Sequence, residues 1–123
     1  MILKINIQIA NISNDRDAQF QEYCFSDPFV VVYSMDYSTE RFKEIGRTEI
    51  GQNDRDYDFT TPINVPYIFN DSQVFRMDVY DSDKQQSRDL SKHDYIGSAT
   101  FNLAEIIHEN RDIQPKKLLD KSG

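Results

Sequence analysis

Residues Val79–Asp94, VYDSDKQQSRDLSKHD, begin as a half-buried strand and continue as a long polar loop. Asp81 and Asp83 stand two positions apart at the end of the strand, and Asp94 closes the loop just before a new apolar run. In an extended chain, residues i and i+2 project to the same side, so we expect the first two carboxylates to share one small volume. Carboxylates held so close repel each other unless a cation lies between them. The pattern predicts a scaffold that brings this loop to a second acidic loop around Asp27.

Alternating strands flank the loop on both sides. Val74–Tyr80 and Tyr95–Leu103 both switch between apolar and polar residues, which is typical of strands with one buried face. The side chains expected to point inward are Phe75, Met77, Val79, Ala99, Phe101 and Leu103; those expected on the other face of the first strand are Arg76, Asp78 and Tyr80. A short helical turn is expected over Asn102–Asn110.

The N-terminal half predicts four more strands. Ile2–Ile12 alternates, and the nearly continuous apolar run Pro28–Met35 suits a strand in the middle of a sandwich. Lys43–Ile50 and Phe59–Pro66 follow, and the two prolines of the latter favour an edge position or a bulge. Six or seven short strands separated by turns predict an all-β, antiparallel β-sandwich that occupies residues 1–123 as one domain.

Composition excludes several classes of function. Cys24 is the only cysteine, so the chain can form neither an internal disulfide nor a cysteine-based metal site, which favours the cytosol. The net charge is −7, and this field repels nucleic acids and other polyanions. No apolar run is long enough to span a bilayer, and the N-terminus lacks the layout of a signal peptide.

Aspartates stand at the ends of the strongest predicted strands. Hard divalent cations bind several oxygen ligands, and calcium accepts irregular cages of carboxylates, carbonyls and water, whereas magnesium demands tighter octahedral geometry. An all-aspartate loop site therefore favours calcium. The alternative is that these side chains are solvated or cap turns. The candidate ligands are Asp27, Asp81, Asp83 and Asp94.

Four segments carry a resemblance that covers nearly the whole chain. They are the opening L-x-I-x-I strand (Leu3–Ile7), SDPFVVVY (Ser26–Tyr33), VFRMDVYDSD (Val74–Asp83) and HDYIG (His93–Gly97). Together they resemble a C2 domain, the calcium- and phospholipid-binding β-sandwich. The resemblance implies a Greek-key sandwich of the phospholipase and copine topology.

Three further segments narrow the resemblance to the first C2 domain of copines. They are EIGRTEI (Glu44–Ile50), VPYIF (Val65–Phe69) and DLSKHDYIG (Asp89–Gly97). By this resemblance the fold would end with one more strand after Lys121–Gly123, so we expect a fragment of a larger copine-like protein that lacks its last strand.

The resemblance also assigns the calcium ligands. Asp27 matches the second ligand of the family, Asp81 and Asp83 match the third and fourth, and Asp94 matches the fifth. The position of the first ligand is occupied by Gln21, an uncharged and weaker ligand. The loop before Asp27 is longer than is usual in the family, and it offers Asp17, Asp15 or Glu22 as substitute ligands.

Apolar and basic residues near these aspartates are expected to contact a membrane. Aromatic side chains of the loop before Asp27 suit the interfacial zone of a membrane. In the loop after Asp81, an apolar residue flanked by two basic residues suits the same zone. Phe25 is equally suited to core packing. The candidates are Phe20, Tyr23, Phe25, Arg88, Leu90 and Lys92.

The function that the resemblance implies is calcium-dependent binding to anionic phospholipid, which would move a cytoplasmic protein to the inner face of membranes. Bound calcium would offset much of the net charge of −7 and reverse its sign at the loop tips. The alternative is a calcium-independent C2 domain that binds a protein partner or has a structural role. A metal-dependent enzyme acting on phosphate esters would need a general base and a substrate pocket, and the sequence offers no evident candidate for either, so we do not expect an enzyme.

Overall fold

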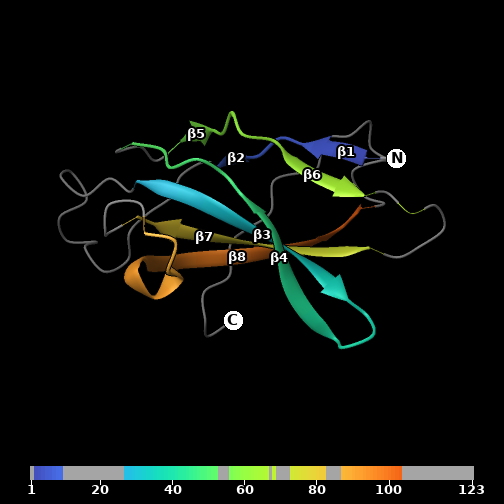
Figure 1. The fold of residues 1–123 in the computed structure, drawn as a ribbon. Helices are drawn as coiled ribbons and strands as arrows, with labels where there is room; N and C mark the ends of the chain where they lie inside the picture. The colour runs from blue at the N-terminus through green and yellow to red at the C-terminus, as the bar shows by residue number, and fades with distance from the viewer. Residues whose placement is uncertain are drawn as a thin grey trace.

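The strands of the chain form two layers that pack face to face (Figure 1). The computed structural model describes residues 2–9, 27–52, 56–66, 68, 73–82 and 87–103. Its strands are β1 (Ile2–Ile5), β2 (Gln8–Ile9), β3 (Pro28–Asp36), β4 (Arg41–Arg47), β5 (Tyr57–Asp58), β6 (Ile63–Pro66), β7 (Val74–Asp81) and β8 (Asp94–Asn102). One layer is a sheet in the order β4-β3-β7-β8, and the other contains the pairs β1-β6 and β2-β5. All pairings are antiparallel, so the predicted antiparallel β-sandwich is confirmed.

β3 occupies the centre of the larger sheet, as its apolar run predicts. It pairs with β4 on one side and with β7 on the other. Its first five residues are buried, and Val31 is 0% exposed although it lies on the face away from the sandwich core. Both faces of this strand are therefore covered, which explains why its sequence does not alternate.

The core fills the space between the two layers. Leu3 and Ile5 of β1 pack against it, as the alternation of the first strand predicts. Gly46 lets β4 approach β6 closely, because a Cβ at this position would lie only 3.1 Å from Cδ1 of Ile63. The buried members of the core are Ile7, Ile9, Val30, Val32, Phe59, Ile63, Val65, Phe75, Val79, Phe101 and Leu103.

Several strand boundaries differ from those expected. The turn between β3 and β4 covers only residues 37–40, and β4 ends at Arg47 instead of Ile50. Beyond Arg47 the chain still follows β3, because Thr48 N–H donates to Val30 O and Gly51 N–H donates to Pro28 O. The strand expected over Phe59–Pro66 is limited to Ile63–Pro66. Irregular edges of this kind leave no periodic signal in a sequence.

Two expectations concern residues outside the described part of the chain. The helical turn expected over Asn102–Asn110 extends beyond residue 103, where the described residues end. The expectation about a last strand also concerns residues outside the described ones. Within the described segments, no helix is long and apolar enough to cross a membrane.

The turn between β3 and β4 holds Glu40 at φ 58°, in the left-handed region. A side chain with a Cβ is strained there, whereas glycine is not. We predict that Glu40→Gly raises the free energy of unfolding by about 0.5–1 kcal/mol. Urea denaturation monitored by circular dichroism measures it. Glu40→Ala, which keeps the Cβ, is the matched control and should bring no gain; equal effects of the two variants would contradict the assignment.

Glu49 joins the two layers just beyond β4. Its carboxylate accepts hydrogen bonds from Thr60 N–H at 2.7 Å, Thr61 N–H at 3.0 Å and the Tyr57 hydroxyl at 3.2 Å. Partial burial opposes ionisation, but the hydrogen bonds from Thr60 and Thr61 outweigh it and lower the pKa of Glu49 to about 2. The ionised carboxylate thus holds the loop between β5 and β6 against the larger sheet.

Because the folded state lowers this pKa from 4.5 to about 2, the stabilisation by Glu49 is present above pH 4.5 and is lost as the pH falls toward 2. We predict that Glu49→Gln lowers the free energy of unfolding by about 1–2 kcal/mol at pH 7. The difference from the unmodified chain should shrink at pH 3. Urea denaturation at the two pH values tests this, and a difference that does not change with pH would contradict it.

Candidate metal and membrane site

The start of β3 and the end of β7 meet at one end of the larger sheet. Asp27 N–H donates to Oδ1 of Asp81 at 2.9 Å, and Ser82 N–H donates to the carbonyl of Asp27 at 2.9 Å. Pro28 is the register partner of Asp81 in the pairing of β3 with β7. Two aspartates that are 54 positions apart therefore lie side by side, held by the main chain of the sheet.

Asp94 is the first residue of β8 and lies at the same end of the sheet, where an irregularity in the pairing of β7 with β8 sets the residue that it faces. The register shifts between Val79 and Tyr80, so that Val79 lies opposite Gly97 but Tyr80 lies opposite Tyr95. This one-residue bulge in β8 places Asp94 directly opposite Asp81. Residues in opposite positions share a face of the sheet, so the two carboxylates are cross-strand neighbours.

The carboxylates of these three aspartates would offer only oxygen donors, which suit a hard cation such as calcium. Like charges in opposite positions are unfavourable, so a cation between them would stabilise the pair. Among the described residues, however, no group of three or more His, Cys, Asp or Glu side chains is arranged to hold a metal ion. The other predicted ligands, Asp83, Asp17 and Gln21, lie outside the described residues, as do Phe20, Tyr23 and Phe25.

The third loop (residues 82–93) ends in a single turn of 3-10 helix at Leu90–Lys92. Asp89 caps this turn, since its Oδ1 accepts from Ser91 N–H at 3.0 Å and from the Ser91 hydroxyl at 2.7 Å. These two hydrogen bonds lower the pKa of Asp89 below its ordinary value. Of the predicted membrane-contact residues in this loop, Arg88 and Lys92 are exposed and Leu90 is half-buried.

Two contacts hold the third loop against the outer face of the larger sheet, the face away from the core. His93 packs edge-on against Phe29 with ring centroids 5.0 Å apart, and its Nε2 lies 2.7 Å from the carbonyl of Ser87. Arg47 of β4 donates from Nη1 to the carbonyl of Arg88 at 3.0 Å. The loop is therefore attached to the sheet at both of its described ends.

The sequence matches the C2 domain family over residues 2–118. The chain is a C2 domain. Copine-A of Dictyostelium discoideum is 36% identical over 98 residues, which cover 80% of this chain and 15% of Copine-A. Nicotinic receptor-associated protein 1 of Caenorhabditis elegans is 28% identical over 120 residues, which cover 85% of this chain and 19% of that protein.

The match to copines shows a copine-like C2 domain, as the sequence segments predict. The chain spans less than a fifth of the length of the two relatives named above. Among solved structures, BON1-C2B superimposes with a TM-score of 0.60 at 18% identity, covering 87% of this chain and 67% of BON1-C2B. This likeness confirms the C2 fold.

The outer face of the C2 domain carries a charge network that sequence reasoning missed. Asp78 lies on this face, as expected, yet it is only 5% exposed. Its carboxylate accepts from Arg76 at 2.9 and 3.2 Å and from the Ser98 hydroxyl at 2.6 Å. The Arg76 guanidinium lies 4.5 Å from the ring of Tyr33 and 4.8 Å from that of Phe42. Strand alternation alone does not reveal such cross-strand partners.

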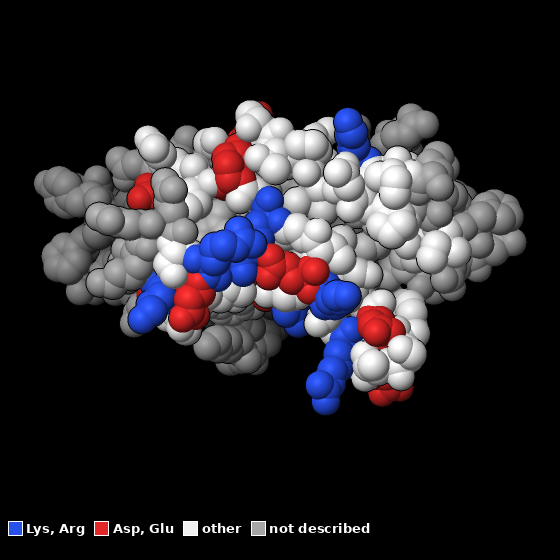
Figure 2. All heavy atoms as spheres, viewed as in Figure 1, with Lys and Arg blue, Asp and Glu red and all other residues white. Residues whose placement is uncertain are grey.

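The charges on the visible face of the C2 domain are mixed. Basic and acidic side chains interleave over the larger sheet (Figure 2). Arg47 pairs with Glu44 at 2.7 Å on the same strand. Burial, with the neighbouring Tyr33 and Asp78 adding to it, raises the pKa of Tyr80 to about 12, so this phenol stays neutral. The face is therefore an ordinary mixed-charge surface and not a purely basic one.

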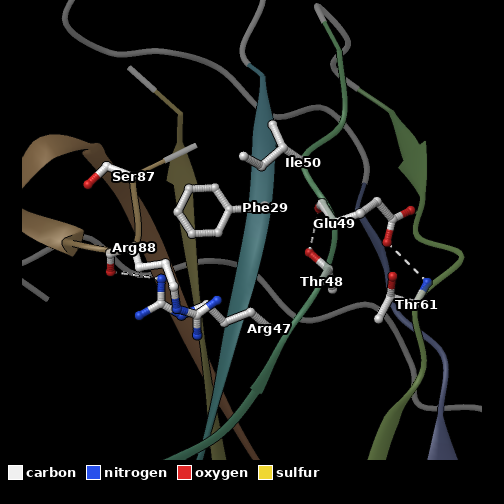
Figure 3. Close-up of a pocket in the computed structure, with 8 residues that line it drawn as sticks. All are labelled: Phe29, Arg47, Thr48, Glu49, Ile50, Thr61, Ser87 and Arg88. Carbon is white, nitrogen blue, oxygen red and sulfur yellow. Dashed lines mark hydrogen bonds between the residues drawn. The ribbon is translucent and has the colours of Figure 1, made fainter. Parts of the chain in front are cut away.

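A hollow of about 310 Å³ lies between the third loop and the strand end beyond β4 (Figure 3). Phe29 and Ile50 supply its apolar wall, and Arg47 and Arg88 lie on one side of it. Glu44 binds Arg47, and the Glu49 carboxylate lies on the opposite side, so the charges around the hollow balance. The hollow's other lining residues are Thr48, Thr61 and Ser87.

Because Arg47 bonds the main chain of the third loop, we predict that Arg47→Lys loosens this loop without unfolding the sheet. Lysine keeps the charge but lacks the planar guanidinium, which donates two hydrogen bonds to Glu44 and a third to the Arg88 carbonyl. Amide hydrogen exchange of a peptide covering residues 87–93 should accelerate on the order of fivefold. Arg41→Lys, at the other end of β4, is the matched control. Unchanged exchange in Arg47→Lys would show that the bond does not position the loop.

Proposed function

We propose that this C2 domain binds anionic phospholipid membranes in a calcium-dependent manner and recruits its parent protein to them. The observation that supports this most directly is the bulge that brings Asp94 opposite Asp81, beside Asp27. Three carboxylates at one end of a sheet have no role in packing the core. They are placed next to a loop that exposes two basic side chains, Arg88 and Lys92.

The chain's own residues would act in two ways. Asp27, Asp81 and Asp94, with Asp83 in the adjoining segment, would hold calcium through carboxylate oxygens. Bound calcium would supply positive charge and coordination positions for lipid phosphate oxygens. Arg88 and Lys92 would attract anionic headgroups, and Leu90 would contact the interfacial zone. In a cell, the parent protein would then move from the cytoplasm to the inner face of a membrane when calcium rises.

The test is co-sedimentation with vesicles of phosphatidylserine and phosphatidylcholine, with calcium or with a chelator. We expect binding to rise with calcium only when phosphatidylserine is present. Asp81→Asn and Asp94→Asn should each weaken calcium binding by about tenfold or more in calorimetric titration, because each removes a charged ligand. An absence of calcium-dependent sedimentation would contradict the proposal.

Asp36→Asn is the matched control. It changes the same residue type at the far end of β3, about 26 Å from Pro28 by the strand rise. Asn can keep the turn in which Asp36 Oδ1 accepts from Ser38 N–H at 3.0 Å. This variant should bind calcium and vesicles as the unmodified chain does.

A calcium-independent C2 domain that binds a protein partner is the second candidate. Gln21, which stands where the family carries its first acidic ligand, favours it. Calorimetric titration separates the two functions, because the second predicts no heat of calcium binding. In either case we propose a binding module and not an enzyme.

A further inference from the structure

Ser91 is a residue of the third loop to which the proposed function gives no role. It ends the tetrapeptide RDLS, Arg88–Ser91, in the third loop. Among the arginines of the whole sequence, Arg88 alone precedes a serine or threonine by three positions. An arginine at this spacing is the pattern by which basophilic protein kinases select their acceptor, since acidic groups on the kinase pair with the guanidinium.

The structure makes this segment accessible. Arg88, Ser91 and Lys92 are all exposed. The single 3-10 turn around Ser91 is closed by two main-chain hydrogen bonds, from Lys92 N–H to Asp89 O and from His93 N–H to Leu90 O. Opening so short a turn costs little, because few contacts are lost. The hydrogen bond of Arg47 to the Arg88 carbonyl and the packing of His93 against Phe29 would meanwhile keep both ends of this segment on the sheet.

We propose that Ser91 is a phosphorylation site for a kinase that requires arginine three positions before the acceptor, and that the modification weakens attachment to anionic membranes. The second half of this proposal rests on the proposed function, whereas the first does not.

The transfer is an ordinary phosphoryl transfer. Oγ of Ser91 attacks the γ-phosphorus of a magnesium-bound nucleoside triphosphate on the kinase. The new O–P bond forms as the bond to the β-phosphate oxygen breaks. The hydroxyl proton passes to a base of the kinase, and the nucleoside diphosphate leaves.

Phosphorylation would reverse two local interactions. The Ser91 hydroxyl donates to Oδ1 of Asp89 at 2.7 Å, and a phosphate in its place would repel that carboxylate and weaken the cap. The loop segment now carries two positive charges, on Arg88 and Lys92, against one negative charge on Asp89. A phosphoserine adds about −1.5 to −2 charges and makes the segment net negative. An anionic membrane would then repel the segment that it attracted.

The first experiment treats the whole chain with the catalytic domain of an arginine-directed kinase and magnesium ATP, and locates phosphate by mass spectrometry. Phosphate is expected on Ser91, with incorporation reduced about tenfold in Arg88→Ala, which loses the charge-assisted pairing with the kinase, and absent in Ser91→Ala. Ser87, with Lys84 three positions before it, is the internal control for residue type within the same loop. No phosphate on Ser91, or equal incorporation in Arg88→Ala, would overturn the proposal.

The second experiment compares the phosphorylated and unmodified chains on phosphatidylserine vesicles at saturating calcium. The phosphorylated chain should bind on the order of tenfold more weakly. Kinase-treated Ser91→Ala should bind as the unmodified chain does. Equal binding of the two forms would overturn the second half of the proposal, that phosphorylation of Ser91 weakens membrane attachment. If neither form binds these vesicles, the proposed function fails, while the incorporation assay still decides whether Ser91 is the acceptor.

Discussion

The hydrogen bond from the main-chain N–H of Asp27 to the carboxylate of Asp81 joins two segments that are 54 positions apart in the sequence. With the return bond from Ser82 N–H to the Asp27 carbonyl, it prolongs the pairing of β3 and β7 to the end of the sheet. The positions of the two aspartates are therefore set by buried strands and not by the loops that follow them. Under the proposed function, this rigid support would hold the two ligands in place while the adjoining loops vary.

The outer face of the domain uses its arginines for internal cohesion. Arg76 is engaged by Asp78 and by two aromatic rings, and Arg47 is engaged by Glu44 and by the main chain at Arg88. Guanidinium groups that are already paired offer little net charge to an outside anion. Under the proposed function, the exposed basic side chains of the third loop, Arg88 and Lys92, would therefore attract an anionic surface more than these two paired arginines.

Sequence reasoning predicted what depends on local periodicity. The alternation of Leu3, Ile5 and Ile7 predicted the correct inward-facing side chains, and the unbroken run of β3 predicted the correct central strand. The bulge in β8 was not predictable, because an extra residue in one strand has no meaning until its partner is known. The contact between Arg47 and the loop carbonyl at Arg88 spans 41 positions and involves no residue pattern, so it was missed for the same reason. The first-loop part of the candidate site belongs to residues that the structure does not describe.

The bulge between Asp94 and Gly97 also limits which part of the loop between β7 and β8 can be exchanged for another sequence. The ends of β7 and β8 that flank the third loop are fixed at Asp81 and Asp94, which are opposite each other. A loop of another length or sequence can be grafted between these two positions without disturbing the pairing of β7 with β8, because long surface insertions cost little free energy. The three positions that end at Gly97 have no such freedom: removing one residue there would turn Asp94 to the opposite face of the sheet. The exchangeable part of the loop therefore ends before His93, whose ring packs against Phe29, and the bulge belongs to the fixed part of the sheet.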